Sequence, residues 1–101
     1  MDYEIRSHGK DSEVFLKGRL TFSDHEAFRN IVAIFKDGGA SRCVLNLSGL
    51  DFIDSAGLGL LLIVRDSAQE KNVSVVLRGA GGAVKKMLDI AKFHEIIPLE
   101  S

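Results

Sequence analysis

Residues 47–62 read Leu47-Ser48-Gly49-Leu50-Asp51-Phe52-Ile53-Asp54-Ser55-Ala56-Gly57-Leu58-Gly59-Leu60-Leu61-Leu62. The stretch opens at the end of an apolar run, Cys43 to Leu47, whose length is typical of a buried strand, and it closes in a run that is apolar from Ala56 to Val64. Between the two runs, Ser55 is suited to the N-cap of a helix, because its hydroxyl can accept from free backbone N–H groups of the first turn. The stretch therefore predicts a strand that leads directly into a helix.

The start of this predicted helix is also the best candidate for a functional site. A helix N-terminus carries partial positive charge and free N–H donors, so it tolerates an anion, including a phosphate on Ser55. Gly57 and Gly59 leave the first turn without side chains, which lets another backbone approach closely. Asp54 places a carboxylate beside the positive end of the helix, where it supports the site electrostatically.

Composition narrows the classes of function. A chain of 101 residues predicts one domain over residues 1–101, and 46% hydrophobic with 27% charged residues is typical of a soluble globular protein. The net charge of −1 leaves no basic stripe, which argues against nucleic acid as the main partner. The longest apolar run, Ala56 to Val64, is too short to span a membrane. The first residues do not form a leader peptide, so we expect a cytoplasmic protein that does not bind membranes.

Cysteine and histidine give no sign of a metal or cofactor. Cys43 is the only cysteine and falls in an apolar run, so we interpret it as a small buried hydrophobic residue. His8, His25 and His94 lie far apart and lack the paired spacing of metal ligands. Asp51 and Asp54 form a single carboxylate pair, which is weak evidence for a metal or for acid–base chemistry. We therefore expect no metal and no cofactor.

Two strands and a helix are predicted before the central stretch. Tyr3–Ser7 alternates and Val14–Gly18 is apolar, and the turn residues 9–12 between them favour an antiparallel hairpin. Ser23 with Glu26 three residues later has the spacing of a capping box. The helix that follows has an apolar face at i, i+3, i+4 and i+7, formed by Phe28, Ile31, Val32 and Phe35, and should end at Gly38-Gly39.

After the central stretch the chain predicts a strand, a helix and an extended tail that is a possible last strand. The helix that begins at Ser55 should run to about Lys71, with Asn72 as a left-handed terminal residue. A strand at Val73–Leu77 and a loop at Gly79–Gly82 come next. The third helix shows an apolar face at Val84, Met87, Leu88 and Ala91, and an extended tail follows at Ile96–Leu99, where Pro98 favours the edge of a sheet.

The order of elements is strand, strand, helix, strand, helix, strand, helix and a possible last strand. Alternating strands and helices pair in parallel through right-handed crossovers, so we predict an α/β fold with a mixed sheet and about three helices. Binding sites in such folds lie where strands end and helices begin. Asp54 and Ser55 fall at such a point.

A helical wheel predicts which side of the central helix faces the protein interior. One side carries Leu58, Leu61, Leu62, Arg65 and Ala68, and the opposite side carries Leu60, Ile63 and Ser67. If the first side packs on the sheet, Leu60 and Ile63 face outward next to Ser55 and suggest a surface that binds a protein. Coverage of both residues by a neighbouring helix or by the C-terminal tail is the alternative.

Enzymatic readings of these motifs find little support. Ser55 as a nucleophile would need glycine two residues before and after it, and Ile53 occupies the first position. No histidine is placed by the sequence to act as its base. Gly79–Val84 matches a dinucleotide fingerprint only in part, because Val84 stands at the third glycine. We therefore predict that the protein is not an enzyme, and a plain helix cap remains the simplest role for Ser55.

Residues 45–59 resemble the signature of STAS domains, especially single-domain bacterial anti-sigma factor antagonists. The resemblance extends over nearly the whole chain, including Gly18-Arg19-Leu20 and residues 84–88. It implies that Ser55 is phosphorylated by an anti-sigma factor that is itself a serine kinase, and that a serine phosphatase of the metal-dependent type reverses the reaction. It also implies that the unphosphorylated protein binds the anti-sigma factor and releases a sigma factor, which would make it a partner-switching regulator of transcription.

Two residues depart from the family pattern. Thr21 follows Leu20, where many members carry an aspartate shortly afterwards, and Ala56 replaces a second Ser or Thr, which removes a competing phosphoacceptor. The resemblance implies a site with Ser55 as phosphoacceptor, Asp54 and Gly57 in support, and a docking surface made of Thr21, Ser23, Asp24, His25, Ala56, Leu58, Gly59, Leu60 and Ile63. The alternative is a constitutive interaction subunit of a transporter or signalling complex, in which Ser55 is only a helix cap.

Overall fold

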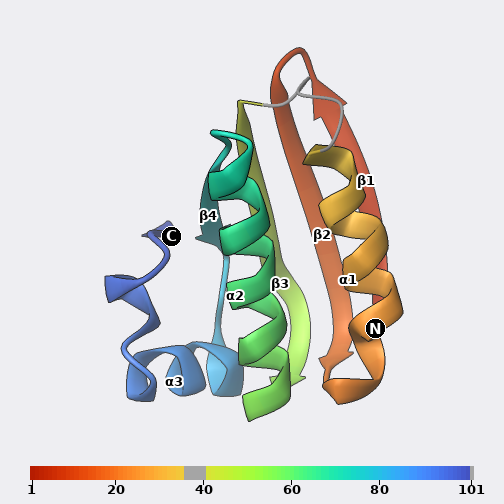
Figure 1. The fold of residues 1–101 in the computed structure, drawn as a ribbon. Coiled ribbons are helices and arrows are strands. Elements are labelled where there is room, and N and C mark those ends of the chain that lie inside the picture. Colours follow the sequence, from red (N-terminus) through yellow and green to blue (C-terminus); the bar gives the residue numbers. More distant parts are fainter. Residues whose placement is uncertain (36–40, 101) are drawn as a thin grey trace.

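The computed structural model describes residues 1–35 and 41–100, and Figure 1 shows helices packed against a curved sheet. In chain order the elements are β1 Asp2–His8, β2 Asp11–Leu20, the 3₁₀ turn η1 Phe22–Asp24, α1 His25–Val32, the 3₁₀ turn η2 Ala33–Phe35, β3 Arg42–Ile53, α2 Ser55–Glu70, β4 Ser74–Arg78, α3 Gly82–Ile90, the 3₁₀ turn η3 Phe93–Glu95 and β5 Leu99–Glu100.

The sheet has the order β1-β2-β3-β4-β5, with β1 antiparallel to β2 and all other neighbours parallel. The predicted α/β fold with an N-terminal hairpin and a mixed sheet is confirmed. Asn72 takes a left-handed conformation with φ of 59° at the end of α2, as predicted. The tail reaches the sheet edge as the two-residue strand β5, so Pro98 precedes a short edge strand.

Strand β3 is much longer than the predicted run of Cys43 to Leu47, because two bulges carry it on to Ile53. Against β2, Phe15 pairs with Asn46 whereas Lys17 pairs with Gly49, and a second shift follows between Gly18 and Arg19. Each bulge adds a residue to β3 and breaks the alternation of buried and exposed side chains. Because of that break, the periodicity of the sequence did not predict the second half of the strand.

The two faces of the sheet differ in chemistry. Val14, Leu45 and Leu77 are register partners and are fully buried on the face that α1 and α2 cover (Figure 1). Because successive side chains of a strand alternate between faces, their neighbours lie on the other face. That face carries a network of ion pairs and hydrogen bonds among side chains of four strands: Glu13, Arg42, Asn46, Arg78 and Glu100.

The first helix begins differently from the prediction. The capping pair is Thr21 and Asp24 rather than Ser23 and Glu26, since a carboxylate oxygen of Asp24 accepts from the Thr21 N–H at 2.8 Å. The capping pair therefore lies two residues earlier than predicted, and the 3₁₀ turn η1 precedes α1. Phe28, Ile31 and Phe35 are buried as predicted, with Phe35 in η2. The predicted stop at Gly38-Gly39 lies outside the described residues.

The network around Glu100 predicts an acid-sensitive contribution to stability. Glu100 accepts from Arg78 Nη2 at 2.8 Å and from Arg42 Nη2, and these interactions, chiefly the hydrogen bond from Arg78, lower the pKa of Glu100. A carboxyl with a depressed pKa in the folded state stabilises the fold above its unfolded pKa and loses that effect as pH falls through the folded value.

Glu100→Gln should therefore lower the free energy of unfolding at neutral pH, and its difference from the wild type should vanish in acid. Urea melts at a series of pH values measure this difference. Glu95→Gln, at an exposed carboxyl of η3, serves as the control and should show no such trend. A Glu100→Gln effect that is equal at all pH values would mean that the charge of Glu100 contributes nothing.

Candidate functional site

The start of α2 is held against the end of β2 by the backbone carbonyl of Leu20. This oxygen accepts from the N–H of Asp54 at 3.2 Å. A Cβ atom at Gly57 would lie 2.6 Å from the same oxygen and 2.8 Å from Ile53 Cγ1. The predicted close approach of another backbone therefore occurs at Gly57. It does not occur at Gly59, where a Cβ atom would meet nothing within 4 Å.

The N-cap of α2 is Asp54, and the prediction that Ser55 is the N-cap is wrong. Asp54 is extended, with φ of −103° and ψ of 179°, and its Oδ1 accepts from the N–H of Gly57 at 2.7 Å. Ser55 is the first helical residue and its side chain is exposed. Aspartate and serine are comparable caps, so the sequence alone does not decide between neighbours. Capping by Asp54 leaves the Ser55 hydroxyl outside the capping interaction.

The buried side of α2 is rotated from the predicted one. Leu60 is 2% exposed, so the expectation that it faces outward is wrong, whereas Ile63 is 47% exposed as expected. Leu58, Leu62 and Arg65, expected to face the sheet, are only partly buried. The first turns of α2 are apolar on all sides, so no polar residue indicates which side faces solvent. The residues that α2 buries are Gly57, Leu60, Leu61, Val64 and Ala68.

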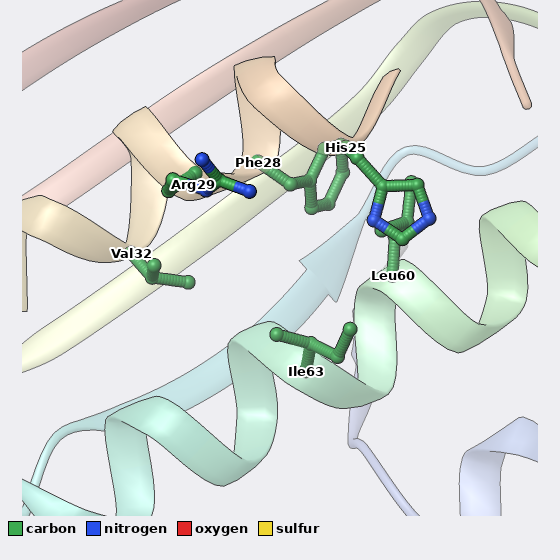
Figure 2. Close-up of a pocket in the computed structure, with 6 residues that line it drawn as sticks. All are labelled: His25, Phe28, Arg29, Val32, Leu60 and Ile63. Atoms are coloured by element: carbon green, nitrogen blue, oxygen red, sulfur yellow. The ribbon is translucent and has the colours of Figure 1, made fainter. Parts of the chain in front are cut away.

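A hollow of about 230 Å³ lies between α1 and α2. Figure 2 shows Leu60 and Ile63 of α2 on one side and residues of α1 on the other. Leu60 forms part of its floor and Ile63 part of its rim. The helix α1 contributes His25, Phe28, Arg29 and Val32. The hollow therefore joins the predicted docking residues His25, Leu60 and Ile63 in one surface.

The loop before α1 lies against the start of α2, because η1 and α2 are in contact. Ser23 and His25 are exposed and Thr21 is partly exposed. Asp24 is 8% exposed, and its carboxylate accepts from the Thr21 N–H and pairs with the amino group of Met1 at 3.1 Å. The Asp24 side chain therefore organises the loop, and its predicted contact with a partner stays a prediction.

Phe22 was missed by the sequence reading. It is 69% exposed and meets the ring of His25 edge to face, with centroids 4.8 Å apart. An aromatic residue in a polar loop was the available signal. Arg29 was not predicted as a site residue either, because a charged residue on a helix is usually interpreted as part of its solvent-exposed face. On the α2 side, Ala56, Leu58 and Gly59 are partly exposed around Ser55.

Cys43, on β3, is a free and buried cysteine. Burial raises the pKa of the Cys43 thiol to about 12, in keeping with the predicted buried hydrophobic role. Within residues 1–35 and 41–100, no group of three or more His, Cys, Asp or Glu side chains could hold a metal ion. None of the helices in that part of the chain is long and apolar enough to cross a membrane.

Comparison with known sequences places these features in a family. A model of the STAS domain family matches residues 2–101. A STAS-domain containing protein of Pseudomonas aeruginosa is 31% identical over 94 residues, which cover 90% of this chain and 89% of that protein. A protein of Bordetella bronchiseptica, provisionally named the anti-sigma factor antagonist BtrV, is 31% identical over 84 residues, or 83% of this chain and 72% of that one.

Solved structures share the fold. The anti-sigma factor antagonist SpoIIAA of Bacillus, in its unphosphorylated form, gives a TM-score of 0.77 at 19% identity over 99% of this chain and 88% of that chain. Its phosphorylated form gives 0.74 at 17% identity over 99% and 92%. A sulfate transporter family protein from Wolinella succinogenes gives 0.75 at 15% identity over 87% and 71%. At these identities the likeness concerns the fold alone.

The two glycines of the first turn of α2 should respond in opposite ways to alanine. Gly57→Ala forces a Cβ atom against the Leu20 carbonyl and should cost about 1–3 kcal/mol of stability, as overpacking does. Gly59→Ala enters open space and should be neutral or stabilise the helix by up to about 1 kcal/mol. Urea melts of both variants measure the difference. Equal melts would show that the start of α2 is not fixed by this contact.

Proposed function

The chain belongs to the STAS domain family, and from that premise we propose that it is an anti-sigma factor antagonist switched by phosphorylation of Ser55. The observation that carries the proposal is the placement of Ser55, exposed at the first position of the 16-residue helix α2 and next to the capping carboxylate of Asp54. A kinase can reach this hydroxyl without unfolding the helix. We place the protein in the cytoplasm, acting by binding rather than by catalysis.

Phosphorylation would change the surface more than the fold. A phosphate adds about −1.5 to −2 charge near neutral pH. At a helix N-terminus this charge meets partial positive charge and free N–H donors, so the helix is not destabilised. The bulk and charge instead appear on the face around Ser55, where Asp54 is already negative. The switch would therefore act by excluding a partner that fits the unmodified face.

The proposed docking surface combines the start of α2 with the loop at residues 21–25 and the hollow between α1 and α2. Ile63 and Phe22 are exposed apolar groups on it, and Arg29 and His25 give it polar edges. Exposed apolar groups with a polar rim are typical of protein interfaces. The partner would be an anti-sigma factor that is also the serine kinase for Ser55, and a serine phosphatase of the metal-dependent type would restore binding.

A constitutive interaction subunit is the second candidate. The similarity of the fold to a sulfate transporter family protein favours it, since STAS folds also occur in that setting. In this case Ser55 would carry no modification in the cell. Modification of Ser55 by a kinase partner separates the two functions.

Ser55→Ala should abolish phosphate uptake from the candidate anti-sigma kinase while binding to the kinase is kept. Because Asp54 is the cap, the variant should change stability by less than about 0.5 kcal/mol, as most surface substitutions do. Intact-mass spectrometry after incubation with kinase and ATP measures phosphate uptake. Ser74→Ala, at an exposed serine that opens β4, is the matched control and should be phosphorylated fully. Phosphate gained by Ser55→Ala would disprove the assignment of the acceptor.

Ile63→Glu should weaken binding to the kinase more than tenfold, because removing an anchor from an interface costs on the order of 2 kcal/mol. Its urea melt should stay within about 0.5 kcal/mol of the wild type, since Ile63 is exposed. Calorimetric titration measures the affinity. Ile90→Glu on α3 makes the same change at an isoleucine that is 71% exposed and should bind normally. Equal losses of affinity for both variants would show that the docking surface does not include Ile63.

A further inference from the structure

The outer edge of β1 is an open end of the sheet. The strand order begins with β1, whose only described neighbour is β2 (Figure 1). The strand is seven residues long, from Asp2 to His8. An edge of this length offers a row of backbone donors and acceptors to another strand.

The geometry of the hairpin shows which residues offer their backbone groups at this edge. His8 and Asp11 are register partners on either side of a two-residue turn, and Gly9 there has φ of 62°. The pair that closes such a turn exchanges both hydrogen bonds, and pairs then alternate along the hairpin. The even-numbered residues therefore bond to β2. Tyr3, Ile5 and Ser7 direct their N–H and C=O groups to the open edge.

We propose that β1 pairs antiparallel with β1 of a second copy of this chain, on a two-fold axis at Ile5, and so joins two sheets into one. In this register Ile5 faces Ile5, and Tyr3 faces Ser7 of the other copy. The three residues with outward backbone groups would then form about six hydrogen bonds across the axis. The interface is isologous, because the same strand is used by both copies.

Charge along the strand selects this register. An axis at Ile5 places Glu4 opposite Arg6, and the two-fold repeats this pair. An axis at Tyr3 would place Asp2 opposite Glu4, and an axis at Ser7 would place no opposite charges face to face within the strand. Like charges directly opposite one another destabilise a strand pair, whereas opposite charges stabilise it. Of the three symmetric registers that use the outward groups, the one at Ile5 is complementary.

The charged groups are available for this pairing. Glu4 and Arg6 are exposed, and the one polar contact between them is their own ion pair, Arg6 Nη2 to Glu4 Oε2 at 3.0 Å. They share a face of the strand, so each can meet its counterpart across the axis. A pair of seven-residue strands makes a small interface, and the dimer should be weak and dependent on concentration.

Charge reversal tests the proposal in solution. Sedimentation velocity over a wide range of protein concentration should show a monomer–dimer equilibrium for the wild type. Glu4→Arg and Arg6→Glu should each weaken dimerisation on the order of tenfold, because each reversal acts at two pairs. The double variant, with both reversals, should recover the wild-type affinity. Glu70→Arg on α2 makes the same charge change at an exposed site away from β1 and should dimerise normally.

A cross-link reports the position of the axis directly. Ile5→Cys should form a disulfide-linked dimer on mild oxidation, since facing residues of a hydrogen-bonded antiparallel pair have Cα atoms about 5.5 Å apart, within disulfide range. Ser7→Cys should not cross-link, because Ser7 faces Tyr3. Cys43 is buried and leaves the new thiol as the reactive one. Urea melts confirm that each variant is folded.

A wild-type protein that stays monomeric throughout would overturn the proposal. So would a dimer that Glu4→Arg leaves unchanged, because it would use another face. Failure of the double variant to recover while its melt is normal would also count against the register. None of these results bears on the phosphorylation of Ser55, which is tested separately.

Discussion

The contact between Gly57 and the Leu20 carbonyl is the constraint on which the site depends. The Leu20 oxygen accepts from Asp54, and the missing side chain of Gly57 lets the helix approach this oxygen closely. These contacts join the ends of β2 and β3 to the first turn of α2. As a consequence the loop at residues 21–25 lies beside the helix start. One backbone oxygen thus brings together the two segments that we propose as the docking surface.

The sequence predicted the features that local patterns encode. The hairpin, the mixed sheet, the long helix and the left-handed Asn72 follow from alternation, turn residues and helix periodicity, each within a short window. The full length of β3 could not be predicted, because its two bulges are defined only by pairing with β2. The buried side of α2 was missed for a related reason: a helix apolar on all sides takes its orientation from its neighbours, and α1 covers Leu60.

The candidate site was predicted in part. Ser55 was placed correctly at a helix start, and the resemblance to a family pointed to the same residue. The roles of Asp54 and Asp24 could not be assigned, because capping depends on backbone angles that the sequence leaves open. Asp24 is a case in point: beside Thr21 and Met1 its carboxylate satisfies backbone and amino groups, so a charged residue in a polar loop is buried. Side-chain type alone does not separate a docking residue from one that shapes the loop.

Capping by Asp54 rather than Ser55 changes what phosphorylation can do. If the Ser55 hydroxyl accepted from the first turn, adding phosphate would alter a hydrogen bond that holds the helix, and modification would change stability together with binding. With Asp54 bonded to the Gly57 N–H at 2.7 Å, the capping hydrogen bond is made without the Ser55 hydroxyl, before any phosphate arrives. The added charge then interacts with two things. One is the positive end of the helix, which stabilises it, and the other is the surface of a partner. Since the first opposes unfolding, the switch that we propose would operate through the second, and the exposed groups around Ser55 would determine which partner it excludes.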